Sequence, residues 1–147
     1  MQSALIQEKT FEKARKEIAK NKGRIIIFSS SDDELNRKIL ENEKIDILLL
    51  NQRQRKDKIK QRNSGFNQVL AKIAKQKNVA IGINLDEIID SEKEKKQEIL
   101  ARVKQNIRIC NKNKLKMKFI PENKRDIYDL RALGLILGMP TWMIKSL

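Results

Sequence analysis

The stretch from residue 45 to residue 85 reads IDILLLNQRQRKDKIKQRNSGFNQVLAKIAKQKNVAIGINL. It begins and ends with short apolar runs, IDILLL at 45–50 and VAIGINL at 79–85. Continuous apolar runs of this length are typical of strands that are buried on both faces of a parallel sheet. Between them, a basic segment leads into residues with helical apolar spacing, namely Phe66, Val69, Leu70 and Ile73. The stretch therefore predicts a strand–loop–helix–strand unit.

The same alternation continues on both sides of this unit. Two more strands are predicted at Arg24–Phe28 and Lys116–Ile120, and the second alternates lysine with apolar residues as an edge strand does. Apolar residues at helical spacing predict helices around Leu35–Leu40, Ile99–Ile107 and Ile127–Leu137, over residues 6–21, and in a last turn at Trp142–Lys145.

Local end signals support these helices. Ser31 with Glu34, and Ser91 with Glu94, have the spacing of a capping box at a helix start. Gly138 followed by Pro140 predicts the end of the late helix, because glycine accepts a left-handed backbone and proline cannot continue a helix.

The element order predicts one α/β domain over residues 1–147 with a mostly parallel sheet and right-handed crossovers. Four predicted strands are too few to close a TIM barrel. We therefore expect an incomplete TIM-barrel-like (β/α) domain whose open sheet edges are covered by helices or by a partner.

The charge balance points to a polyanionic partner. Lys and Arg total 33 against 19 Asp and Glu, so the net charge is +14 and the pI is about 10.0. Nucleic acid is the first candidate, followed by a membrane surface or an acidic protein.

Composition also excludes several classes of protein. The single cysteine, Cys110, excludes a disulfide framework and a cysteine zinc site, and its apolar surroundings place it in the core. The absence of histidine excludes histidine metal clusters and histidine-based nucleophilic catalysis. No apolar run approaches the roughly 18 residues of a membrane span, and residues 1–20 lack the apolar stretch of a signal peptide. We expect a cytoplasmic protein that binds no cofactor of its own.

The basic segment at residues 51–67 is the first candidate for RNA contact. It follows a predicted strand, where α/β folds place functional loops. One acid, Asp57, lies among six cations: Arg53, Arg55, Lys56, Lys58, Lys60 and Arg62. Such side chains neutralise phosphates and release counterions; the alternative is a solvated basic loop. The turn at residues 63–65 either presents backbone N–H groups to an anion or is an ordinary turn.

A second basic cluster spans residues 112–125. It contains Lys112, Lys114, Lys116, Lys118, Lys124 and Arg125 against Glu122, and its function is left open between RNA contact and solvation. Aromatic residues are only 4 % of the chain, so phosphate and shape recognition are expected to dominate over base stacking.

Several of these segments resemble a known family. Residues 62–89, RNSGFNQVLAKIAKQKNVAIGINLDEII, resemble the central block of ribonuclease P protein component 3, the archaeal relative of a eukaryotic ribonuclease P/MRP subunit. Residues 101–120 resemble the next helix and strand of that family, and DLRALGLILGMP at 129–140 resembles its closing helix. The resemblance covers about residues 40–140.

The resemblance implies a barrel-like subunit that supports a catalytic RNA in removing 5′ leaders from precursor tRNA. Cleavage would belong to the RNA and its Mg²⁺ ions. The implied partners are ribonuclease P RNA, ribonuclease P protein component 2 and other protein subunits, with precursor tRNA contacted indirectly. Family basic residues carry over to Arg62, Lys72, Arg102 and the Lys112 region, and Arg53 and Arg55 fall in the equivalent basic loop.

The chain also departs from the family pattern. Gln68 stands where the family usually has a histidine, and members are usually longer, so this chain is expected to begin partway round the barrel. Distant relatives are metal-dependent phosphoesterases with histidine-rich sites, which a chain without histidine does not inherit.

Two other functions stay open. One is a protein–protein scaffold whose charge serves solubility. The other is a Mg²⁺-dependent phosphoesterase that uses Asp32, Asp33 or Asp86, although acids in a first helical turn are ordinary partners of the helix dipole.

Overall fold

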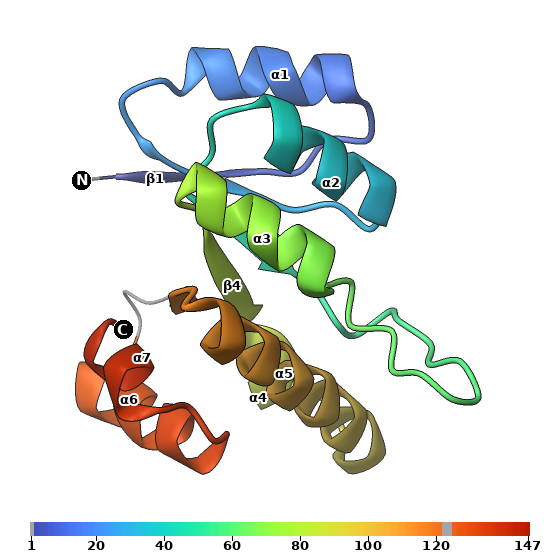
Figure 1. Cartoon of the computed structure of the whole chain (residues 1–147), viewed down its shortest axis with the longest axis vertical. Coiled ribbons are helices and arrows are strands. Elements are labelled where there is room, and N and C mark those ends of the chain that lie inside the picture. The colour runs from blue at the N-terminus through green and yellow to red at the C-terminus, as the bar shows by residue number, and fades with distance from the viewer. Residues whose placement is uncertain (1, 122–124) are drawn as a thin grey trace.

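A computed structural model of the chain describes residues 2–121 and 125–147 (Figure 1). Within these ranges the chain forms five strands and seven helices, each strand being followed by at least one helix. Their order is β1 (Ser3–Ile6), α1 (Phe11–Lys20), β2 (Ile25–Phe28), α2 (Asp33–Asn42), β3 (Ile47–Leu50), α3 (Gln68–Lys77), β4 (Ala80–Asn84), α4 (Leu85–Asp90), α5 (Lys93–Asn113), β5 (Met117–Ile120), α6 (Ile127–Ile136) and α7 (Thr141–Lys145).

The five described strands form one sheet in the order β1-β2-β3-β4-β5, and every neighbouring pair is parallel. A parallel sheet whose strands follow chain order, with a helix after each strand, is a section of a (β/α) barrel. The predicted α/β class, the parallel sheet and the incomplete TIM-barrel-like architecture are confirmed. β5 lies at the edge of the sheet, as the alternation of lysine with apolar residues predicted.

The main core lies between the sheet and the helices α1, α2, α3 and α5, which cover one face of it (Figure 1). Alternate strand residues enter this layer, among them Phe28, Leu48 and Ile81. The residues between them, Ile27, Ile47 and Leu49, form a smaller buried cluster of their own. Both faces of the strands are thus apolar, which explains why their sequences are continuous apolar runs.

The N-terminal part differs from the prediction. A helix was predicted over residues 6–21, but Ile6 ends strand β1 and the helix begins at Phe11, after Thr10 accepts a hydrogen bond from the Lys13 N–H. Strand β1 has only four residues, SALI, and its pairing with β2 stabilises a segment that carries no strand pattern of its own. The short helix α4 was also missed, because its six residues are too few to show helical spacing and its first residue, Leu85, was included in the predicted strand run at 79–85.

Both predicted capping boxes are wrong. Asp32, not Ser31, caps α2 by accepting from the N–H groups of Glu34 and Leu35. Ser91 closes α4, and the residue that precedes α5 makes no side-chain cap.

The predicted stop of the late helix is confirmed. Gly138 has a φ of 92°, and the Met139 N–H donates to the Gly134 carbonyl at 2.9 Å, which is the closing bond of a Schellman motif. The core position predicted for Cys110 is confirmed as well, and burial raises the pKa of its thiol. No helix in the described ranges combines the length and the apolar character that crossing a membrane requires.

Gly82 in β4 gives a test of the smaller apolar cluster. A Cβ at this position would lie 3.1 Å from side-chain carbons of Ile47 and Leu49, and 3.2 Å from the Leu49 Cα. Because the backbone of β3 cannot move aside freely, Gly82→Ala is expected to lower the free energy of unfolding by about 1–3 kcal/mol. Urea unfolding followed by circular dichroism measures this, and an unchanged midpoint would contradict the close packing of β3 against β4.

Candidate nucleic-acid interface

The basic loop, residues 51–67, joins β3 to α3 and protrudes from the body of the molecule (Figure 1). Its tip is a tight turn in which Lys58 and Gln61 exchange backbone hydrogen bonds of 2.9 and 3.2 Å. Ile59 at this tip is fully exposed. The loop follows the carboxyl end of a central strand, which is where the sequence predicted a functional segment.

The side chain of Arg55 is largely buried and connects the two ends of the basic loop. Arg55 donates through Nη2 and Nη1 to the two carboxylate oxygens of Asp33, at 2.6 and 2.9 Å, and its side chain is only 9 % exposed. It also donates to the Asn51 carbonyl at 2.9 Å and to Asn63 Oδ1 at 3.2 Å. Gly65 has a φ of 75°, and a Cβ there would collide with the Arg55 guanidinium.

A second arginine reaches the loop from α5. Arg102 is 1 % exposed and donates 2.9 Å hydrogen bonds to Asp57 Oδ1 and to the Gln52 carbonyl. Asp57 Oδ1 also accepts from the Asn63 N–H at 2.8 Å. Burial opposes the charge on Asp57 and would raise its pKa, but these two donors outweigh it, so the pKa of Asp57 lies below the ordinary value of 3.8.

Polar side chains from α4 and β4 hold the start of the loop. The Glu87 carboxylate accepts from the backbone N–H groups of Gln52 and Arg53 at 2.8 and 3.2 Å. Asn51 donates to Ser29 Oγ at 2.9 Å and accepts from Asn84 at 2.8 Å. The basic loop is therefore fixed by side chains from five other elements or their ends, namely β2, α2, β4, α4 and α5.

These contacts give two of the predicted RNA ligands partners inside the protein. Arg55 and Arg102 were predicted to contact RNA, but both guanidinium groups donate to a carboxylate and to a backbone carbonyl inside the protein. Through these contacts both arginines hold the loop in place. A sequence pattern alone could not separate them from the exposed cations, because their acidic partners lie 22 and 45 residues away.

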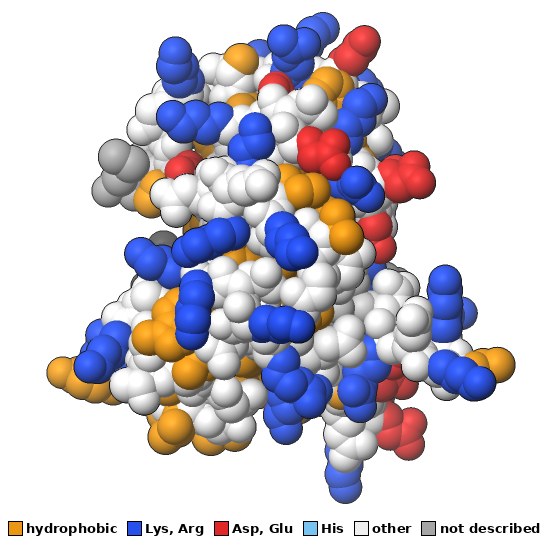
Figure 2. Space-filling model, in the orientation of Figure 1, with side chains coloured by type: hydrophobic (Ala, Val, Ile, Leu, Met, Phe, Trp, Pro, Cys, Tyr) orange, Lys and Arg blue, Asp and Glu red, His pale blue; other side chains and the backbone are white. Residues whose placement is uncertain are grey.

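The other predicted cations are exposed. They are Arg53, Lys56, Lys58, Lys60 and Arg62 in the basic loop, Lys72 on α3, Lys112 and Lys114 at the end of α5, and Arg125 before α6. In the view of Figure 2, basic side chains gather over α3 and α5 and on the protruding loop. Glu122 and Lys124 of the second basic cluster lie outside the described residues.

The structure adds two exposed cations that were not predicted from the sequence. Lys104 and Arg108 on α5 line a hollow of about 310 Å³ together with Arg62 of the loop. With Lys112 they form a row at four-residue spacing on the solvent face of α5. That spacing is visible in the sequence and could have revealed the row.

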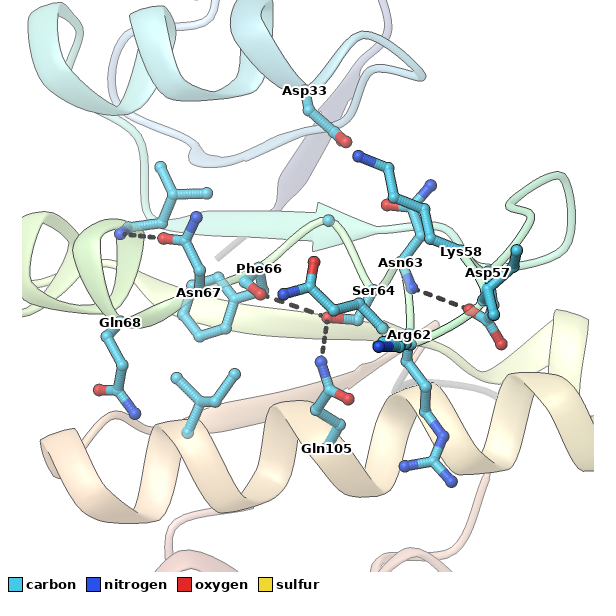
Figure 3. A pocket seen from close by; sticks show the side chains of 16 residues that line it. Asp33, Asp57, Lys58, Arg62, Asn63, Ser64, Phe66, Asn67, Gln68 and Gln105 are labelled. Carbon is cyan, nitrogen blue, oxygen red and sulfur yellow. Dashed lines mark hydrogen bonds between the residues drawn. The ribbon is translucent and has the colours of Figure 1, made fainter.

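A larger hollow of about 960 Å³ lies between the basic loop, the start of α3 and α5 (Figure 3). Lys58, Lys60 and Arg62 line its loop side. Gln68, at the place of the family's histidine, is exposed at the first position of α3 and accepts from Asn113 at 2.8 Å.

The candidate Mg²⁺ ligands have other partners. Asp32 caps α2 and Asp33 pairs with Arg55, whereas Asp86 lies exposed in the first turn of α4. Across residues 2–121 and 125–147, no three histidine, cysteine or acidic side chains gather closely enough to hold a metal ion.

Comparison with known proteins identifies relatives. Residues 6–145 match the model of the family described as RNase P subunit p30. Ribonuclease P protein component 3 of Methanosarcina mazei is 31 % identical over 108 residues, which cover 74 % of this chain and 42 % of that protein. The same component of Methanococcus maripaludis strain C7 is 28 % identical over 127 residues, covering 86 % and 51 % respectively. The chain spans about half the length of these curated relatives.

A similar chain also occurs in a solved structure, the cryo-EM structure of archaeal ribonuclease P with mature tRNA. The two align with a TM-score of 0.74 and 22 % sequence identity, over 96 % of this chain and 62 % of that chain. This likeness confirms the fold.

Removing the carboxylate of Asp57 is expected to loosen the basic loop. Asp57→Ala leaves the buried Arg102 guanidinium with one carbonyl partner, and because Asp57 is itself 35 % exposed we expect a loss of about 1–3 kcal/mol in the free energy of unfolding. Urea unfolding measures the loss, and tryptic cleavage within residues 51–67 should accelerate. Asp90→Ala, which removes an exposed acid on α4, is the control, and equal effects of the two changes would contradict the anchoring role.

The Asp57 contact also predicts a dependence on pH. Because the pKa of Asp57 is lower in the folded protein than in the unfolded chain, the contact stabilises the fold above about pH 4 and is lost as the pH falls through the folded-state pKa. NMR titration of the Asp57 carboxyl carbon and the Arg102 Nε–H should give one shared midpoint below 3.8. In Asp57→Asn the Arg102 signal should not titrate, and a midpoint at or above the ordinary value would refute the assignment.

Proposed function

The chain belongs to the RNase P subunit p30 family, and from this membership we propose that it is a non-catalytic, RNA-binding subunit of ribonuclease P. In this role it supports the catalytic RNA in removing 5′ leaders from precursor tRNA. The observation that carries the proposal is the family match over residues 6–145. The net charge of +14 and the exposed cations agree with it.

The proposed contact surface combines the basic loop with the outer faces of α3 and α5. On the loop, Lys58, Lys60 and Arg62 approach phosphates, and Lys104 and Arg108 extend the positive surface along α5. Lys72, Lys112, Lys114 and Arg125 are further proposed contacts. Neutralising phosphates releases counterions, which supplies affinity without reading sequence.

The remaining assignments follow from the same membership. We propose ribonuclease P RNA, ribonuclease P protein component 2 and other protein subunits as partners, precursor tRNA as an indirect one, and the cytoplasm as the location. The protein would bind no cofactor, and the Mg²⁺ ions of cleavage would be held by the RNA. The relatives' names and the archaeal complex with mature tRNA support this proposal.

A reconstitution assay tests the function. Precursor-tRNA cleavage by ribonuclease P RNA is measured at low Mg²⁺, with this protein and component 2 added singly and together. We expect stimulation only when both proteins are present. Cleavage by this protein without RNA would favour the phosphoesterase alternative, and partner binding that survives high salt without RNA affinity would favour the scaffold.

Neutralising the exposed loop cations tests the contact surface. The triple change Lys58→Gln, Lys60→Gln and Arg62→Gln should weaken binding to ribonuclease P RNA, because up to three phosphate contacts are lost. The slope of log Kobs against log salt concentration should become shallower by about one for each contact. Filter binding at several salt concentrations measures both quantities.

A matched control separates contact from net charge. Lys9→Gln, Lys13→Gln and Lys16→Gln remove the same charge from exposed positions in and just before α1, at the opposite end of the molecule from the loop (Figure 1). This variant should keep the slope of the unaltered protein. Identical losses in both variants would mean that only overall charge matters.

A further inference from the structure

The larger hollow combines three kinds of chemistry in one place. The basic loop supplies one side, the start of α3 closes one end, and the face of α5 that carries Gln105 and Ile109 forms the opposite side (Figure 3). Its volume of about 960 Å³ is at the upper end of the roughly 300–1,000 Å³ that ligand pockets span. It is therefore large enough for a small organic group.

The loop side of the hollow suits a phosphate. Lys58, Lys60 and Arg62 all line it, and the anchoring of the loop by Arg55 and Arg102 keeps this side in place. The first turn of α3, whose N-cap is Asn67, contains no acidic residue. Two carboxylates, Asp33 and Asp57, also line the hollow, but each is paired with an arginine, Arg55 or Arg102. An anion near the first turn of α3 would therefore meet a helix N-terminus and lysines that are unpaired within the described residues.

The rest of the lining suits a nucleobase. Four side-chain amides surround the hollow, from Asn63, Asn67, Gln68 and Gln105. In each amide one polar atom already makes a hydrogen bond. The oxygens of Asn67, Asn63 and Gln68 accept from the Leu70 N–H, from Arg55 and from Asn113. The nitrogen of Gln105 donates weakly to Ser64 at 3.4 Å. The second polar atom of each amide makes no hydrogen bond to the described residues. Phe66, Leu70 and Ile109 supply apolar surface beside them.

We propose that this hollow binds one unpaired nucleotide of an RNA strand, an inference that rests on the proposed RNA-binding function. The phosphate lies against the loop cations, and the base lies between α3 and α5, where the free amide groups reach its hydrogen-bonding edge. A paired base cannot enter, because its edge is occupied and its neighbours are stacked; sequence-specific RNA recognition uses splayed, single-stranded bases for this reason. The surface thus joins a general phosphate contact to one site of single-strand recognition.

Short RNAs test this directly with the full chain. A hexamer of single-stranded oligouridylate and a blunt RNA duplex of twelve base pairs are titrated separately, and the side-chain amide signals are followed by ¹⁵N-resolved NMR. We expect the hexamer to shift the Gln68 and Gln105 amide signals and the duplex to leave them in place. Equal shifts with both RNAs, or no shift of these two signals with the hexamer, would overturn the proposal.

Glutamine variants on α3 and α5 provide the matched comparison. The double variant Gln68→Ala and Gln105→Ala should bind the hexamer about three- to tenfold more weakly, as the loss of one or two hydrogen bonds implies, with duplex affinity unchanged. Gln76→Ala, an exposed glutamine on α3 that does not line the hollow, should bind like the unaltered protein.

The outcomes distinguish the two proposals. If the unaltered protein binds neither the short RNAs nor ribonuclease P RNA, the proposed function fails. If it binds ribonuclease P RNA and the duplex but the double variant retains full affinity for the hexamer, the function stands and the nucleotide site is refuted. Circular dichroism confirms that the double variant is folded before either conclusion is drawn.

Discussion

The buried guanidinium of Arg102 is the constraint on which the candidate interface depends. A charge that is 99 % removed from solvent must find partners inside the protein, and Arg102 finds them in Asp57 and in the Gln52 carbonyl, both on the basic loop. Three other residues of α5, Ile99, Val103 and Ile107, lie in the main core and hold this helix against the sheet. The loop therefore takes its position from α5, although it is joined in sequence to β3 and α3.

Charge repulsion explains why such an anchor is needed. Six cations in one short loop repel one another and favour an extended, solvated chain. Asp33 pairs with Arg55 of the loop, and Asp57 of the loop pairs with Arg102 of α5. Glu87 accepts from the backbone N–H groups where the loop begins. Three acids from different parts of the chain thus hold the loop, while its remaining cations stay exposed to solvent. Of these three acids, only Asp33 is also one of the Mg²⁺ ligands that the sequence suggested for a phosphoesterase.

The sequence predicted correctly those features that depend on residues close together in the chain. Strands β2 to β5, their parallel arrangement and the basic loop all follow from apolar runs and charge counts that a few neighbouring residues carry. Strand β1 was missed because SALI is stabilised by pairing with β2 rather than by its own pattern. Ser31 was misassigned as a cap because Asp32, the next residue, is an equally good cap and only the backbone geometry decides between them. The roles of Arg55 and Arg102 depend on contacts across 22 and 45 residues, and no local pattern reports those.

A fixed loop also changes the energetics of binding a polyanion. Ordering a flexible segment costs about 1–2 kcal/mol of backbone entropy per residue, and each long side chain that is immobilised adds to this cost. Here the ion pairs of Arg55 and Arg102, the Glu87 contacts and the turn at Lys58–Gln61 impose that order during folding. The exposed lysines keep their side-chain freedom, but their backbone is already in place when a strand arrives. Electrostatic attraction can then be converted into affinity instead of being offset by the ordering of the loop, and the hollow beside it keeps a shape to which a single nucleotide can be fitted.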